Sequence, residues 1–245
     1  MLKNKFSLIF QEGPIGRAYL NFFKLNNIMP NKIYYLYKKK FLPRGLNLRI
    51  FFQNKNFYAL KNLSFNQNLC NDIENFFNFK KNFISDMYKF ELINEFKDNI
   101  VYIPDENINC SIIFDKLLES NEENFLNTSN QIYKKTLDTK KNFYHVHPGF
   151  LPKSRGADGS LNSILYHGNL GVSFFKMTKE IDIGDIYLRK IIQIKKFNLN
   201  NYSQKNLKDV YRIWFSFFDP IIRTSLLKNI FDNNFKFSPI DVSNE

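Results

Sequence analysis

The sequence predicts an α/β protein: a mostly parallel, Rossmann-like sheet with flanking helices, closed by a C-terminal helix. The first observation is the order of segments near the N-terminus, where an apolar run at 5–10, a glycine-containing turn and a helical pattern precede an aromatic-rich run at 32–40. Strand, helix and strand in this order form a βαβ unit, whose crossover connection makes the two strands parallel. The second observation is that 245 residues, 44% of them hydrophobic, are enough for one well-packed core.

The rest of the chain alternates between segments with helical and with strand-like patterns of apolar residues. We expect helices at 68–97, 121–137, 157–169 and 206–234, the last kinked at Pro220, and strands at 99–104, 109–114, 142–148, 171–178 and 185–194. Pro148 should end its strand, because proline has no amide hydrogen for a sheet ladder. Gly168 stands just beyond a predicted helix, where glycine commonly ends helices.

The organisation indicates one α/β domain at 1–196 and a helical extension at 197–245 that packs on the same domain. No segment approaches the roughly 18 apolar residues of a membrane-spanning helix, and the first apolar run is too short for a signal peptide. Two cysteines are too few for a disulfide framework. We therefore expect a cytoplasmic protein with no membrane partner.

The charge balance is basic, with 35 Lys and Arg against 23 Asp and Glu and a formal net charge of +12. A positive field of this size attracts anions such as nucleic acids, phosphorylated metabolites or carboxylate-bearing cofactors. An alternative is that lysine is simply the default polar residue of a chain crowded with Lys, Asn, Ile and Phe. Both interpretations remain open.

Two of the three histidines, His145 and His147, lie two positions apart at the end of a predicted strand. In an extended segment their side chains point to one face, at the strand end where open parallel sheets bind ligands. They could bind a metal, serve as structural residues, or take part in acid–base and oxyanion chemistry. A catalytic zinc usually has three protein ligands, and only His167 and carboxylates such as Asp182 remain to complete such a set.

Three short motifs follow one another between about 140 and 195. They are His145-Val146-His147-Pro148-Gly149-Phe150-Leu151-Pro152 with Arg155-Gly156, then Gly171-Val172, then Ile181-Asp182-Ile183-Gly184-Asp185. This segment resembles the catalytic core of the folate-dependent formyltransferases, the family of the glycinamide ribonucleotide, methionyl-tRNA and nucleotide-sugar N-formyltransferases. The family has Asn-x-His-Pro/Gly and Leu-Pro-x-x-Arg-Gly, a Thr-Gly-Val strand and Leu-Asp-x-Gly-Asp/Pro in the same order and at close to the same spacing.

The resemblance implies a formyltransferase catalytic domain at 1–196 that moves the formyl group of N10-formyltetrahydrofolate to a primary amine, with no metal. It assigns catalysis to His145, His147 and Asp182. Both histidines would donate hydrogen bonds to the oxygen that becomes negative, and His147 would also relay a proton. Asp182 would orient His147 and set its protonation.

The resemblance also assigns binding residues. Those facing the folate would be Ile181, Ile183, Gly184 and Asp185, in a turn that frames the pterin and that Gly184 allows to be tight. Arg155 and Gly156 would shape the side of the cleft that receives the amine substrate.

One departure from the family pattern concerns its first catalytic residue, an asparagine that donates through its amide. Here that position is His145. A neutral imidazole can also donate one N–H, so the role can be kept, with a pH dependence that asparagine lacks. The substitution is equally compatible with a lost or altered activity.

Elimination favours a small acceptor, best a nucleotide-linked amino sugar. The tRNA-formylating enzymes resemble a longer protein with a C-terminal β-barrel, whereas the part of this chain after 196 predicts one helix and a short tail, so tRNA is a weaker candidate. A homodimer remains possible. Two other functions stay open: a metal-dependent hydrolase with the histidine pair as ligands, and a folate-binding protein without turnover.

Overall fold

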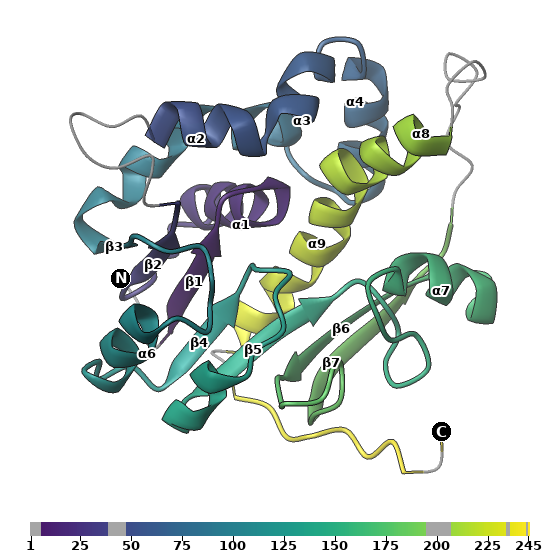
Figure 1. Cartoon of the computed structure of the whole chain (residues 1–245). Helices are drawn as coiled ribbons and strands as arrows, with labels where there is room; N and C mark the ends of the chain where they lie inside the picture. The colour runs from purple at the N-terminus through teal and green to yellow at the C-terminus, as the bar shows by residue number, and fades with distance from the viewer. Residues whose placement is uncertain (1–5, 39–47, 195–206, 234–235, 244) are drawn as a thin grey trace.

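The computed structural model describes residues 6–38, 48–194, 207–233, 236–243 and 245 (Figure 1). Its sheet has seven strands in the order β3-β2-β1-β4-β5-β6-β7. Their bounds are β1 Ser7–Gln11, β2 Ile33–Leu36, β3 Ile100–Ile103, β4 Asn124–Asn127, β5 Asn142–His147, β6 Leu170–Lys176 and β7 Ile186–Ile192. The first five are parallel, and β6 and β7 are antiparallel to their neighbours. The predicted fold class is confirmed.

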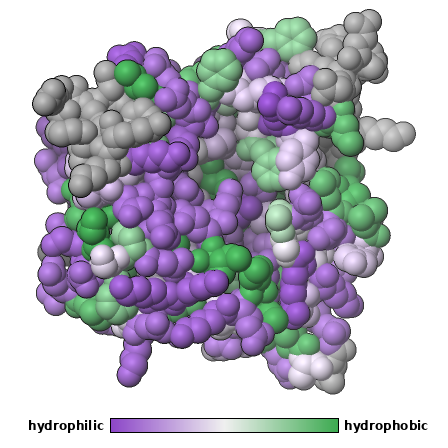
Figure 2. All heavy atoms as spheres, viewed as in Figure 1, coloured by the Kyte–Doolittle hydropathy of each residue, from purple (hydrophilic) through white to green (hydrophobic). Residues whose placement is uncertain are grey.

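The described helices surround this sheet. Their bounds are α1 Pro14–Leu25, α2 Leu48–Lys55, α3 Phe57–Asn62, α4 Gln67–Phe76, α5 Phe83–Met87, α6 Ser111–Leu118, α7 Gly159–His167, α8 Leu207–Ile213 and α9 Asp219–Asp232, with the 3₁₀ helices η2 Phe90–Asn99 and η3 Lys135–Thr139 and the π-helix η5 Trp214–Phe218. The molecular face in Figure 2 is mainly hydrophilic, with hydrophobic side chains in scattered patches.

The two larger parts of the core lie one on each face of the sheet, because successive strand side chains point to opposite faces. Leu8 and Phe10 of β1 pack with α1, α5 and α9 in the larger cluster. Ile9, between them, packs with Ile113 and Leu117 of α6 in the smaller cluster on the other face. β1 is thus buried on both faces, as expected of a parallel strand covered by helices.

Two predicted elements are wrong: a predicted strand is a helix, and a predicted helix contains a strand. The strand expected at 109–114 is the start of helix α6, in which Ile113 and Leu117, four positions apart, turn to the core. The helix expected at 121–137 contains strand β4, whose Phe125 and Leu126 are both 0% exposed. A strand covered on both faces shows no alternation, so a short apolar run does not distinguish it from a helix.

Two predicted helices are interrupted. The segment 68–97 divides into α4, α5 and η2, with Asn78 and Asn82 in left-handed backbone conformations between them. The C-terminal segment 206–234 passes through η5, and Pro220 lies in the first turn of α9 directly after it. A single wider π turn inside a helix changes which side chains face the core, and such turns are frequent at functional sites.

The C-terminal part of the chain packs on the sheet. Helix α9 lies against α1 and β6 (Figure 1). Ile240 continues the packing by donating its amide hydrogen to the Ile186 carbonyl of β7 at 2.7 Å. The proposed division at 196/197 lies outside the described residues. Of the helices that the structure describes, none has the length and apolar character needed to cross a membrane.

Candidate active site

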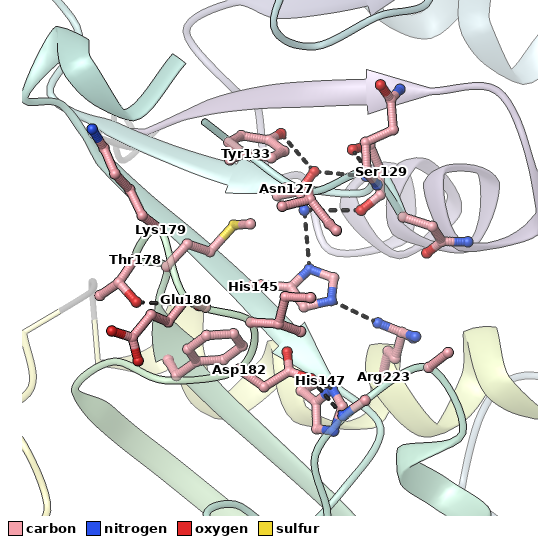
Figure 3. Close-up of a pocket in the computed structure, with 18 of the residues that line it drawn as sticks. Asn127, Ser129, Tyr133, His145, His147, Thr178, Lys179, Glu180, Asp182 and Arg223 are labelled. Carbon is pink, nitrogen blue, oxygen red and sulfur yellow. Dashed lines mark hydrogen bonds and ion pairs between the residues drawn. The ribbon is translucent and has the colours of Figure 1, made fainter. Parts of the chain in front are cut away.

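A cavity of about 500 Å³ opens at the carboxyl ends of β4 and β5 (Figure 3). The loop 127–133 forms one wall, the turn 177–182 a second, and Tyr211, Phe215 and Arg223 from the C-terminal helices a third. Ligands of open α/β sheets bind at this edge, and the volume lies within the range of small-molecule sites. The cavity therefore qualifies as a candidate active site.

His145 lies on the cavity wall between two donors. Its Nε2 is 2.9 Å from Nη1 of Arg223, and its Nδ1 is 3.2 Å from the amide Nδ2 of Asn127 (Figure 3). Arginine can only donate, so Nε2 must accept and the ring proton of neutral His145 belongs on Nδ1. In this tautomer the Nδ1–H of His145 and the Nδ2–H of Asn127 are both donors, so the contact between them is van der Waals packing and not a hydrogen bond. Both ring nitrogens thus face the protein, and Nε2 has no hydrogen to offer a ligand.

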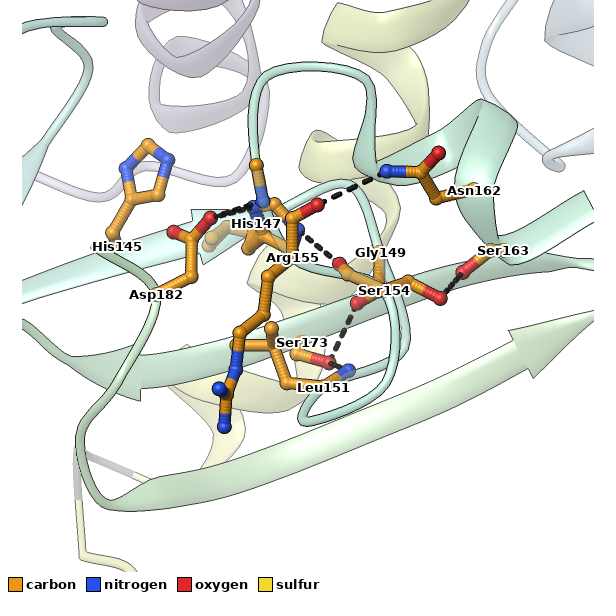
Figure 4. A network of polar contacts seen from close by, with 12 residues as sticks. His145, His147, Gly149, Leu151, Ser154, Arg155, Asn162, Ser163, Ser173 and Asp182 are labelled. Atoms are coloured by element: carbon orange, nitrogen blue, oxygen red, sulfur yellow. Dashed lines mark hydrogen bonds and ion pairs between the residues drawn. The ribbon is translucent and has the colours of Figure 1, made fainter. Parts of the chain in front are cut away.

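His147 has the opposite arrangement. Its Nε2 lies 2.6 Å from the carbonyl oxygen of Ser154, which can only accept, so the ring proton belongs on Nε2 (Figure 4). Its Nδ1 lies 3.6 Å from Oδ2 of Asp182 and carries the lone pair. The residue is 3% exposed, and burial lowers the pKa of His147 although the Asp182 carboxylate opposes that change. The neutral imidazole therefore presents a base beside a carboxylate that would stabilise the protonated form.

Asp182 joins the turn 177–182 to the loop that follows β5. It has a left-handed backbone with φ 53, and its Oδ2 accepts the amide hydrogen of Gly156 at 2.8 Å. The same oxygen faces His147 (Figure 4). One carboxylate therefore fixes the loop and faces the imidazole.

The loop after β5 is held by two serines. Ser173 of β6 donates to the carbonyl of Gly149 at 2.7 Å and accepts the amide hydrogen of Leu151 at 3.0 Å. Ser163 of α7 accepts the amide hydrogen of Phe150 at 2.8 Å. These bonds satisfy the backbone of a loop that lies under the His147 ring.

Two glycines pack against the same ring. A Cβ at Gly149 would lie 2.6 Å from Nε2 of His147, and one at Gly159 would lie 2.3 Å from it. Any side chain at either position would displace the imidazole, so the glycines help to fix its orientation.

The predicted catalytic residues all line the cavity, whereas only some of the predicted binding residues do. His145, His147, Asp182, Ile181 and Gly156 line the cavity.

The remaining predicted residues, Arg155, Ile183, Gly184 and Asp185, are not among its lining residues. The Arg155 side chain points away from His145, His147 and Asp182 (Figure 4). Gly184 lies so close to the Lys176 carbonyl that a Cβ would be 1.9 Å from that oxygen. Asp185 accepts the Lys176 amide hydrogen at 2.9 Å through its backbone, so this part of the turn supports the cavity from beneath.

Sequence reasoning missed Asn127 and Arg223. Asn127 accepts from the Ser129 amide and from the Tyr133 hydroxyl, both at 2.7 Å, which orders the wall 127–133. Neither residue belongs to a recognised motif, and Asn127 lay in a segment predicted to be helical. Only the i, i+4 pair of Asp219 and Arg223 could have drawn attention to α9.

The described residues contain no group of three or more His, Cys, Asp or Glu side chains arranged to hold a metal ion. His167 ends α7, where its ring packs edge-on against Phe150 with centroids 5.4 Å apart, and it does not line the cavity.

The histidines predict how stability depends on pH. Burial, Arg223 and His147 together hold the pKa of His145 well below 6.5. Between that lowered value and 6.5 the unfolded chain binds more protons than the folded one, so the free energy of unfolding should fall as the pH is lowered below about 6.5. Urea unfolding at several pH values should show this fall in the wild type and a smaller one in His145→Asn. Equal slopes in the two proteins would contradict the assignment.

No protein-family model matches the chain. A methionyl-tRNA formyltransferase of Thermotoga maritima is 39% identical over 66 residues, which are 26% of this chain and 21% of that protein. One of Pseudothermotoga lettingae is 42% identical over 69 residues, 27% of this chain and 22% of that protein. The matched segments are therefore a small part of these relatives.

The fold likeness extends further than the sequence likeness. The X-ray structure of a sugar N-formyltransferase from Shewanella sp FDAARGOS_354 has a TM-score of 0.53 and 17% identity, and the match covers 98% of this chain and 74% of that chain. The fold is thus the formyltransferase fold over nearly the whole chain, and the resemblance predicted from the motifs is confirmed. The chain is thus similar to formyltransferases in a short sequence segment and in its fold.

Proposed function

We propose that this protein is an enzyme that transfers a formyl group from N10-formyltetrahydrofolate to the primary amine of a small nucleotide-linked amino sugar. The observation that carries the proposal is the pair of His147 and Asp182, in which the ring nitrogen with the lone pair faces a carboxylate oxygen at 3.6 Å beside the cavity. The folate would supply a formyl carbon that the amine attacks while negative charge gathers on the formyl oxygen.

The cavity fits a folate head group by its chemistry. Ile132, Phe175, Met177 and Phe215 offer apolar surface to the faces of a flat ring. Asn127, Ser129 and the backbone of the two lining loops offer polar groups to its edge. Apolar walls with a few fixed polar groups are typical of cofactor sites.

His147 acts in this proposal as the base. Its Nε2–H is held by the Ser154 carbonyl, so Nδ1 is the nitrogen that accepts the proton lost by the attacking amine. Asp182 then faces an imidazolium and stabilises it, as a carboxylate does for other catalytic imidazoles. Returning the proton to the leaving nitrogen restores the neutral ring.

The other predicted residues would contact the ligands or hold the loops that carry the catalytic side chains. Ile181 and Gly156 would contact ligands directly, since both line the cavity. Ile183, Gly184 and Asp185 would hold the turn that presents Ile181 and Asp182. Arg155, on the outer side of the loop, would meet only the part of the acceptor that extends beyond the cavity.

A thermal-shift titration with a stable formyl-folate analogue, with and without zinc, tests the donor. Saturable stabilisation by the folate alone is expected, about 2.7 kcal/mol at a ligand concentration of 100 Kd. Ala157→Trp, which narrows the cavity wall, should weaken the shift, whereas Leu165→Trp, on the exposed face of α7 outside the cavity, should not.

Formyl transfer is then measured against nucleotide-linked amino sugars, glycinamide ribonucleotide and methionyl-tRNA. Formation of an N-formyl amino sugar supports the proposal. Formylation of methionyl-tRNA alone would identify tRNA as the acceptor instead. A shift with zinc and none with folate would contradict the proposal in favour of a metal-dependent hydrolase. A folate shift without turnover on any acceptor would leave a folate-binding protein.

A further inference from the structure

Arg223 of α9 places a buried guanidinium at the wall of the cavity. The residue is 5% exposed and lines the cavity beside His145 (Figure 3). Its Nε donates to Oδ2 of Asp219 at 2.9 Å, and its Nη1 donates to Nε2 of His145 at 2.9 Å and to the Val146 carbonyl at 2.7 Å. Three hydrogen bonds to groups on two elements hold the guanidinium in one orientation.

The second terminal nitrogen of this guanidinium is unused. Among the described residues, Nη2 has no hydrogen-bond partner. It is not a fully buried atom, because it is absent from the set of buried polar side-chain atoms that lack a partner. Nη2 is therefore a charged donor, on a residue that lines the cavity, and it is left for a ligand or solvent.

His145 is the residue that gives Arg223 this position. Its Nε2 accepts from Nη1 and so cannot donate into the cavity. The resemblance places an oxyanion donor at position 145, but Nε2 of His145 has no hydrogen to donate. The guanidinium of Arg223, a stronger donor, lies next to it. Hydrogen bonds from ionised donors are roughly twice as strong as those from neutral ones.

We propose that Arg223 donates through Nη2 to the formyl oxygen as it becomes negative, and that His145 is a positioning residue that orients the guanidinium. This inference rests on the proposed function. The proton and electron pair move as described above, with His147 taking the proton from the amine. Arg223 transfers nothing, and its fixed charge and that of its partner Asp219 are already present before the reaction, which is the property of an effective oxyanion site.

The first test needs no turnover and uses formate as a small carboxylate probe. The imidazole ¹⁵N resonances of His145 and His147 are followed as sodium formate is added. We expect saturable shifts in the wild type and in Lys228→Gln, which removes one exposed positive charge from the same helix, and none in Arg223→Gln. Equal formate binding by Arg223→Gln would overturn the assignment, whether or not the formyltransferase proposal holds.

The second test uses the acceptor found above. Arg223→Gln should lower kcat by about 100- to 1,000-fold, the usual cost of one oxyanion donor, with little change in the KM values of donor and acceptor. Arg223→Ala should be partly rescued by millimolar guanidinium and not by sodium chloride at equal ionic strength. His145→Gln, whose side-chain oxygen can take the place of Nε2 and accept from Nη1, should keep kcat within about tenfold of the wild type, as expected of a positioning residue.

The kinetic results separate the two roles that an arginine can play. A fall in kcat at constant KM, with rescue by guanidinium, supports the donor. A rise in KM at constant kcat would make Arg223 a substrate-binding residue and overturn the proposal. A loss of formate binding without any formyl transfer by the wild type would leave the anion site in place and reject only the formyltransferase reaction.

Discussion

Replacing His147 by asparagine should lower the rate of formyl transfer by about 100- to 10,000-fold, because the variant lacks the nitrogen lone pair that accepts the proton of the amine. Asparagine has no atom at the position of Nε2, so the contact with the Ser154 carbonyl is lost as well and the folding of the variant has to be checked. The measurement is kcat under saturating donor and acceptor, with far-UV circular dichroism to confirm that the variant is folded.

The matched control is His167→Asn, which removes another histidine of the same protein outside the cavity. It should keep nearly full activity. Asp182→Asn is the companion variant, because its side-chain oxygen can still accept from Gly156 while the negative charge facing His147 is lost. We expect it to slow transfer and to leave the donor Kd nearly unchanged. His147→Asn and His167→Asn with equal activity would remove His147 from the mechanism.

The local geometry around His145, His147 and Asp182 could be predicted because local chemistry determines it. Alternation along an extended segment places the two histidines on one face, and Pro148 ends the strand directly after them. The Asp-x-Gly turn at 182–184 then has a tight geometry whatever surrounds it. Local rules therefore predict the shape of this strand end and of this turn, whereas their meeting at one site was implied by the resemblance to the formyltransferases.

The roles of these side chains could not be predicted to the same extent, because distant residues decide them. Whether His145 donates or accepts depends on Arg223, 78 positions away in the sequence. That arginine reaches the cavity from a helix interrupted by a π turn, and no periodicity predicts such an interruption. The same limit explains the error at β4, where burial on both faces erased the alternation that identifies a strand.

A second large effect is expected at the start of α1, where Glu12 and Arg17 form an ion pair with 0% exposed side chains. The carboxylate of Glu12 accepts two hydrogen bonds from Arg17, both at 2.7 Å. It also accepts from the Tyr35 hydroxyl at 2.7 Å and the Asn56 amide at 2.9 Å. Glu12→Gln would set an amide N–H₂ against these donors and leave a buried guanidinium without its counter-charge.

We expect Glu12→Gln to lower the free energy of unfolding by about 3–5 kcal/mol, the usual cost of removing one partner of a buried ion pair. Glu95→Gln, in η2, is the control, since it removes an exposed ion pair with Lys24 of α1. The side chains of Lys24 and Glu95 are 44% and 49% exposed. It should cost at most about 1 kcal/mol. Urea unfolding of both variants and of Glu12→Gln/Arg17→Met measures the difference, and the double variant should recover much of the loss.

The same ion pair bears on where a ligand can bind. The N-terminus of a helix that follows the first strand is a common phosphate site. Here the carboxylate of Glu12 lies in the turn before α1, and Pro14 at its start has no amide hydrogen to offer. Phosphates of the acceptor should therefore bind elsewhere, and Glu12→Gln should lower stability while leaving the Kd of the formyl-folate analogue unchanged. A matching loss of folate affinity in the folded variant would mean that this buried cluster and the cavity at β4 and β5 act as one site.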